Sequence, residues 1–155
     1  TIPVGKQQTD GVELTLAGTL PGGLQAFAGY AWLDSTMVKS VAVESGQQVQ
    51  GKSATLTPTH SANLWLSKDL PAGFNVGGGV NYVGDRYANL GNTVTLPAYT
   101  TLDAAVRYRI KALDLQLNLN NLTDRKYFVA GHGSNANLNL PGAPRNAALT
   151  ARYAF

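Results

Sequence analysis

Residues 113–121 read LDLQLNLNN, a run in which apolar and polar residues alternate. The leucines stand at positions 113, 115, 117 and 119, and Asp114, Gln116, Asn118 and Asn120 stand between them. Successive side chains of a strand point to opposite faces, so the leucines would share one face. A helix, with about 3.6 residues per turn, would spread them around its circumference. The stretch therefore predicts a β-strand with one apolar and one polar face.

The same period of two recurs along most of the chain. It is present in GVELTLAGTL (11–20), LQAFAGYAWLDS (24–35), HSANLWLSKDL (60–70), FNVGGGVNYV (74–83), TLDAAVRYRI (101–110) and NAALTARYAF (146–155). We therefore expect about seven strands of roughly 9 to 13 residues, longer than the usual 5 or 6 of globular sheets and close to the length that crosses a bilayer. The sequence predicts an all-β fold, an antiparallel meander.

The connections expected between these strands alternate between short turns and long loops. Short turns are expected at Pro21–Gly23, Pro71–Gly73 and Lys111–Ala112, whereas the connections over residues 36–58, 86–97 and 123–144 are long and rich in Gly, Asn, Ser, Gln and Pro. Outer-membrane barrels have brief turns at the periplasmic end and extended loops outside. This segregation favours a membrane barrel over a soluble sandwich.

Composition narrows the classes of protein further. Only 14% of the residues are charged, the net charge is +3 without a Lys/Arg run, and there is no cysteine. These values argue against nucleic acid as a partner and exclude disulfides and thiolate metal sites. No run of about 18 apolar residues predicts a membrane helix, and the N-terminus does not resemble a signal peptide. A soluble β-sheet binding domain and a membrane barrel remain open at this point.

Charge placement favours the barrel. The apolar faces are almost free of charge, whereas Glu13, Asp103, Arg107, Asp114 and Arg152 fall on the polar faces. A lipid-facing Arg at mid-depth costs about 2–4 kcal/mol, so the charged side would line the lumen. Aromatic residues near strand ends fit the two interfacial girdles, and we expect there Tyr30, Trp32, Tyr82, Tyr99, Tyr108, Tyr153 and Phe155.

Four stretches carry a family resemblance. They are TDGVELTLAGTLPGGLQAFAGYAWLDS (9–35), YVGDRYANLGNTVTLPAYTTLDAAVRYRI (82–110), LNLNNLTDRKYF (117–128) and PGAPRNAALTARYAF (141–155). In this order and spacing they resemble successive C-terminal strands of TonB-dependent outer-membrane receptors, most closely those for ferric siderophores. The resemblance covers nearly the whole chain.

The resemblance implies a place in a larger protein. The family builds a barrel of 22 strands around an N-terminal plug domain, and single-chain bacterial barrels have an even strand number. We therefore expect residues 1–155 to be a C-terminal segment of such a receptor, with the plug and the earlier strands absent. The resemblance also implies that the terminal alternation is read by the barrel assembly machinery; its residues are Leu149, Ala151, Tyr153 and Phe155.

The implied function is energised uptake of a ferric siderophore through the outer membrane of a Gram-negative bacterium. The implied partners are the siderophore, the TonB complex acting through the missing N-terminal region, and outer-membrane lipid. Iron would arrive already chelated, so no cofactor or metal ligand of the protein's own is expected. Aromatic and cationic residues on the extracellular side are the ligand-binding candidates, namely Trp32, Arg86, Tyr87, Tyr127, His132 and Arg145.

The same chain offers residues for two alternative functions. His60 and His132 lie on the long-loop side, so a hydrolase at the barrel rim with Asp34, Asp85 or Asp124 is conceivable. No nucleophile motif or metal-ligand spacing supports a catalytic site, and we expect no enzyme. A passive porin is the other barrel class.

Overall fold

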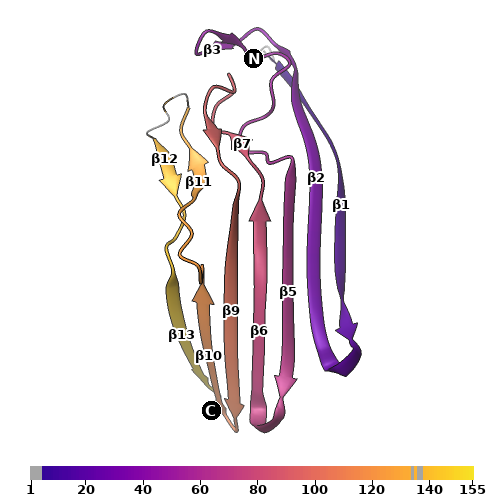
Figure 1. Cartoon of the computed structure of the whole chain (residues 1–155), viewed down its shortest axis with the longest axis vertical. Helices are drawn as coiled ribbons and strands as arrows, with labels where there is room; N and C mark the ends of the chain where they lie inside the picture. Colours follow the sequence, from indigo (N-terminus) through magenta and orange to yellow (C-terminus); the bar gives the residue numbers. More distant parts are fainter. Residues whose placement is uncertain (1–4, 134, 136–137) are drawn as a thin grey trace.

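The computed structural model describes residues 5–133, 135 and 138–155, and most of it forms a curved antiparallel sheet of seven strands (Figure 1). The seven strands of the sheet are β1 (Gly5–Leu20), β2 (Leu24–Ser40), β5 (His60–Leu70), β6 (Phe74–Val83), β9 (Tyr99–Ile110), β10 (Leu113–Asn120) and β13 (Asn146–Tyr153). Their order in the sheet is their order along the chain. The predicted all-β meander is confirmed. No helix of the described residues is long and apolar enough to span a membrane.

The three predicted short turns lie at one end of the sheet, here called the turn end (Figure 1). Two are the 3-10 turns η1 (Pro21–Gly23) and η2 (Pro71–Gly73), and the third is formed by Lys111 and Ala112. Gly73 has a φ of +84°, and a Cβ there would collide with the carbonyl oxygen of Arg109. Glycine is required at this turn because a neighbouring strand passes so close.

The three long connections lie together at the opposite, loop end (Figure 1). Each contains a small hairpin: β3 (Val43–Glu44) with β4 (Gln47–Gln48), β7 (Arg86–Tyr87) with β8 (Thr95–Leu96), and β11 (Phe128–Gly131) with β12 (Asn139–Pro141). The most deeply buried residues of the described chain also lie here. Val49 and Leu96 are fully buried, as expected if the loops pack on one another.

Strand lengths depart from the expected range of roughly 9 to 13 residues. β1 and β2 have 16 and 17 residues, whereas β10 and β13 have 8 each. The long pair continues past the apolar zone as a ribbon with polar side chains, such as Gln8 opposite Thr36. β10 is short because Asn121 takes a left-handed φ of 51° and redirects the chain.

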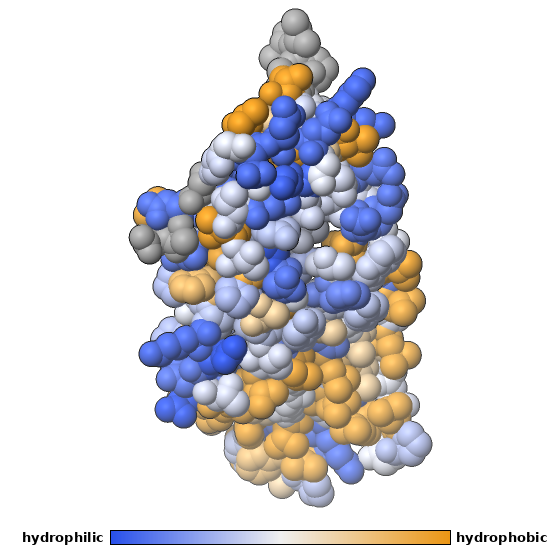
Figure 2. Space-filling model, turned by 45° about the horizontal axis from the view of Figure 1, so that its top comes forward, coloured by the Kyte–Doolittle hydropathy of each residue, from blue (hydrophilic) through white to orange (hydrophobic). Residues whose placement is uncertain are grey.

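Strand register separates the side chains into two faces. One row of paired residues crosses the apolar face through Leu16, Ala28, Leu64, Val80 and Leu102. The adjacent row crosses the polar face through Thr15, Gly29, Asn63, Asn81 and Thr101. Large apolar side chains on the first face are exposed, with Leu16 at 64% and Leu149 at 73%. Figure 2 shows the hydrophobic side chains gathered over the lower part of the molecule, away from the hydrophilic loop end. The apolar face suits contact with lipid.

Aromatic residues on the apolar face form two bands. Tyr30, Trp32, His60 and Tyr82 lie toward the loop end, and Phe74, Tyr108, Tyr153 and Phe155 toward the turn end. Tyr82 lies eight positions after Phe74 in β6, about 26 Å of strand at 3.3 Å per residue. With a strand tilt of about 35–45° this length rises about 18–22 Å, so the two aromatic bands fit the borders of an apolar band roughly 25 Å tall.

The girdle interpretation of Tyr99 is wrong. Tyr99 lies nine positions before Tyr108 in β9, and an odd separation places two side chains on opposite faces. It pairs with Val83 and contacts Tyr127 on the polar side. Tyr99 therefore belongs to the lumenal wall.

Candidate functional site

Arg86 opens β7 and is 5% exposed. Its guanidinium donates through Nη2 to the carbonyl oxygens of Phe128 at 2.6 Å and Val129 at 3.2 Å, both in β11. The guanidinium carbon also lies 5.5 Å from the centre of the Tyr99 ring, a distance typical of a cation–π contact. The sequence singled out Arg86 as a ligand cation, whereas its contacts join two loops to the sheet.

Tyr127 lies against the Tyr99 ring, with ring centres 4.2 Å apart. Its other side is close to Gly142, where any Cβ would overlap the Tyr127 ring. Both tyrosines are half-buried at the point where β9 begins and where the chain leaves β10. The structure thus brings Arg86 and Tyr127 together around Tyr99.

Asp103 forms the floor next to these tyrosines. One carboxylate oxygen accepts the backbone N–H of Asn121 at 2.8 Å, and the other accepts the Asn81 side-chain amide at 2.9 Å. Asn121 is 3% exposed. Its side chain donates to the carbonyl oxygens of Arg125 and Ala143 and accepts the N–H of Arg125. These hydrogen bonds fix where the chain leaves β10 and where it enters β13.

A hollow of about 280 Å³ lies over this network on the polar face. We call it the wall niche and define it by Asn81, Tyr99, Asp103, Asn121 and Tyr127. Its lining has one carboxylate and no lysine or arginine. The wall niche is a polar recess with aromatic residues on the loop side.

The remaining predicted ligand residues lie apart from the wall niche. Trp32 is on the apolar face and pairs with Val12 and His60, as a girdle residue would. Tyr87 is half-buried in β7 opposite Thr95. The exposed His132 follows β11, and its N–H donates to Leu138 O at 3.1 Å.

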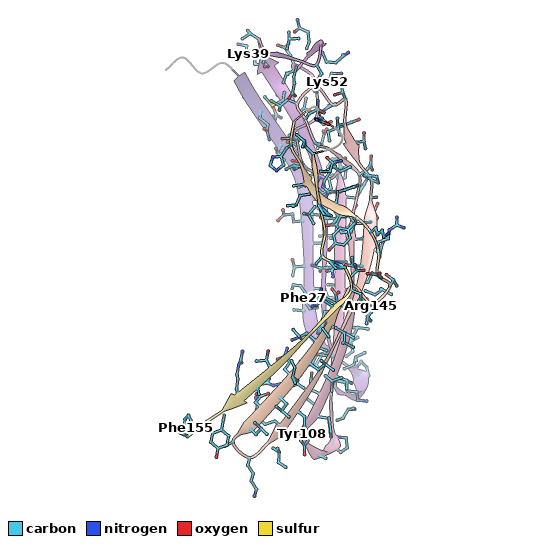
Figure 3. The ribbon with its side chains drawn as sticks, turned by 90° about the vertical axis from the view of Figure 1, so that its left-hand side faces the viewer. Phe27, Lys39, Lys52, Tyr108, Arg145 and Phe155 are labelled. Atoms are coloured by element: carbon cyan, nitrogen blue, oxygen red, sulfur yellow. The ribbon has the colours of Figure 1, made fainter. Side chains whose placement is uncertain are left out.

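Arg145 is exposed near mid-height of the sheet, between the loop-end Lys39 and the turn-end Phe155 (Figure 3). Its N–H donates to Asp124 Oδ1 at 2.9 Å. Backbone geometry therefore accounts for the position of Arg145, and its side chain remains a candidate for ligand contact.

The loops are joined to one another by polar contacts. Asn92 accepts the N–H of Ser53 at 2.8 Å and donates to its carbonyl at 3.0 Å, and Glu44 Oε2 accepts the N–H of Gly91 at 2.8 Å. Together with Arg86 these bonds connect all three long connections. We call the three connected segments the joined loops (residues 41–59, 84–98 and the described part of 121–145).

Sequence reasoning missed Asn121, Asp103 and Tyr99 as members of the candidate site. The motif NNLTDRKY contains Asn121, but the residues it holds lie up to 22 positions away. Among the described residues no group of three His, Asp or Glu side chains could hold a metal ion. The absence of a cofactor stays a prediction.

Comparison with known proteins gives a family match over most of the chain. The family described as TonB dependent receptor-like, beta-barrel matches residues 1–122.

Individual relatives agree with that match. The Ferrioxamine receptor of Yersinia enterocolitica is 32% identical over 161 residues, which cover 99% of this chain and 22% of the relative. The Catecholate siderophore receptor Fiu of Escherichia coli K12 is 32% identical over 159 residues, covering 97% and 20%. The crystal structure of the siderophore receptor PiuA from Acinetobacter baumannii superposes with a TM-score of 0.84 at 32% identity, covering 96% of this chain and 22% of that one. The chain thus spans a minor part of the length of these relatives.

Proposed function

Because the chain belongs to the family of TonB-dependent receptor β-barrels, we propose that it is part of a receptor that imports ferric siderophores. The barrel is an outer-membrane protein of a Gram-negative bacterium. The family match is the observation that carries the proposal. Relatives that match nearly the whole chain are named as siderophore receptors, and we propose the same function for the protein of which this chain is part.

The division of faces supports this function. The apolar face would contact lipid, and the polar face would form part of a water-filled lumen wall. On that wall Asp114 accepts hydrogen bonds from Arg107 and Arg109, so charge is held inside, where water and polar partners are available. A substrate would meet the joined loops first and the polar wall next.

The partners follow from the same proposal. The intact receptor would bind the ferric siderophore outside, draw energy from the TonB complex through its N-terminal region, and enter the membrane through the assembly machinery that reads Leu149 to Phe155. Iron enters as a chelate, so the protein supplies contacts to the siderophore and not to the metal. The receptor would not be an enzyme.

The candidate ligand residues differ in how accessible they are to a ligand in the lumen. Tyr127 on the polar side and the exposed His132 and Arg145 are the best placed for ligand contact. Tyr87 is less accessible, and Trp32 faces the lipid side. Arg86 would act by holding β7 to β11.

Uptake of radioactive iron tests the proposal. The intact receptor should be expressed in a Gram-negative host lacking its own siderophore receptors and supplied with a panel of ferric hydroxamates and ferric catecholates. We expect iron accumulation for one class of chelate, abolished by collapsing the proton gradient or by deleting the host TonB. Uptake that continues without energy would favour a passive porin, and no uptake of any chelate would overturn the proposal.

A further inference from the structure

We propose that the wall niche binds a neutral or positively charged arm of the transported chelate and disfavours anionic groups. This inference rests on the proposed function and adds to it the charge of the preferred substrate. The relatives do not decide this point, because one is named for ferrioxamine and another for catecholate siderophores.

Size limits what the wall niche can hold. Sites for whole drug-sized ligands commonly measure about 300–1,000 Å³, and this hollow has about 280 Å³. The hollow would therefore admit one arm of a chelate while the iron centre stayed in the lumen. It opens on the polar face beside the rings of Tyr99 and Tyr127.

The charge of the lining determines which kind of chelate arm the wall niche would bind. Asp103 is the single acidic residue of the lining, and the two N–H groups of Asn81 and Asn121 donate to its carboxylate. The cation nearest to the tyrosines, Arg86, is buried and already donates to the carbonyl oxygens of Phe128 and Val129. An incoming anion would thus meet a carboxylate and no free guanidinium or ammonium group of the lining.

The rest of the lining offers hydrogen bonds. The rings of Tyr99 and Tyr127 pack on one another and against Arg86 and Gly142, so their faces are used within the protein and they line the hollow as polar groups. The amide of Asn81 can hydrogen-bond neutral groups, because one of its N–H groups is used by Asp103 and its oxygen remains an acceptor. An ammonium or amide arm would satisfy these groups.

Binding to the purified intact receptor tests the inference. Three probes separate charge from shape: ferrioxamine B, whose ammonium group extends from a neutral iron–hydroxamate centre, the same chelate with its amine acetylated, and an anionic ferric tris-catecholate. We expect ferrioxamine B to bind best. Asp103→Asn should weaken its binding about tenfold, leave the acetylated chelate within twofold, and improve the binding of the catecholate.

Two further variants serve as controls for this interpretation. Glu13→Gln removes an acid from the same polar face away from the hollow and should leave all three affinities unchanged. Tyr99→Phe removes a hydroxyl group of the lining and no charge, so it should change the affinities for ferrioxamine B and for its acetylated form by the same factor.

The outcomes separate the two proposals. If the wild-type receptor binds no ferric chelate, the proposed function fails and the charge preference fails with it. If the wild type binds chelates but Asp103→Asn alters the binding of the charged and acetylated forms equally, the proposed function stands and the wall niche has no role in charge selection.

Discussion

Asn121 joins two segments that leave and re-enter the sheet. Its left-handed backbone turns the chain away from β10, and its buried side chain bonds Arg125 and Ala143. Asn is among the few residues that adopt this conformation readily, and its amide can both donate and accept. One side chain thus sets where β10 ends and where the chain returns toward β13.

Replacing Asn121 by glycine tests this role without adding backbone strain. Glycine permits the positive φ, but the N–H and carbonyl groups of Arg125 and the carbonyl of Ala143 lose their side-chain partner. A hydrogen bond contributes about 0.5–1.5 kcal/mol net, so we expect the loss of three to cost about 2–4 kcal/mol. The thermal midpoint of the detergent-solubilised receptor should fall clearly. Asn118→Ala, which breaks only a side-chain bond with Gln116, is the control. Equal midpoints for both variants would contradict the role of Asn121.

Phe155 has a different kind of importance. The residue is fully exposed and its ring contacts that of Tyr153, with ring centres 5.4 Å apart. Such a position adds little to the stability of the folded protein. Its proposed role is to be recognised during assembly.

Phe155→Asp in the intact receptor should therefore lower the amount of heat-modifiable barrel in the outer membrane several-fold. Molecules that do assemble should keep the wild-type thermal midpoint, since little packing is lost. Ala154→Asp, which introduces the same charge one residue earlier, just after the end of β13, is the matched control. Wild-type surface levels of Phe155→Asp would remove the assembly interpretation.

At the scale of the elements, the strands and short turns could be predicted because each depends on neighbours in sequence. Alternation gave the faces of β10 and β9, and Pro-Gly stretches marked η1 and η2. The members of the wall niche could not be predicted in this way. Arg86 lies 42 positions from its partner Phe128, and no local pattern encodes that pairing. Tyr99 was assigned to the wrong face because an aromatic residue at a strand end is compatible with either face, and only the strand register decides between them.

Glycines of β6 make room for Trp65 of β5. A Cβ on Gly77 would lie 2.8 Å from Cζ2 of the indole, and one on Gly79 would lie 2.6 Å from Cε3. Gly78 points to the other face, where the nearest atom would be 3.5 Å away. The outer two glycines of this run thus receive a tryptophan on the polar wall.

A double-mutant cycle measures this fit. Gly77→Ala should destabilise the receptor by about 1–3 kcal/mol, as overpacking does, whereas Gly78→Ala should change stability little. In the background of Trp65→Leu, the cost of Gly77→Ala should largely disappear, because the indole atoms it meets are gone. A cost independent of residue 65, read from thermal midpoints of the four proteins, would show that the backbone and not Trp65 excludes a side chain.

At the scale of the whole molecule, the joined loops behave as one body. Asn92 with Ser53, Glu44 with Gly91, and Arg86 with β11 link segments that the sequence separates widely. Ala88, Val94 and Leu96 form a small buried apolar cluster within the second of these loops. The loops would therefore open together or not at all.

Hydrogen exchange on the intact receptor tests that coupling. Arg86→Met removes the bonds to Phe128 and Val129, and bonds to charged groups contribute about 1.5–3 kcal/mol. Exchange in β11 and β12 should become at least about tenfold faster, and the turn end should keep its wild-type protection. Arg145→Met, a change at an exposed arginine, should leave β11 unaffected. Unaltered exchange in Arg86→Met would mean that the hairpin is held elsewhere.

The meander pairing has an evolutionary consequence. Each strand bonds only to its neighbours in sequence, and two strands with one short turn restore both chain direction and the facing of side chains. A gene duplication that inserts one such hairpin lengthens the circumference without reversing any existing strand or turning an apolar face inward, whereas a single added strand would bring the chain to the wrong side of the membrane. Ancestral barrels of different circumference would thus differ by pairs of strands, and each added pair would keep the long loops on the extracellular side.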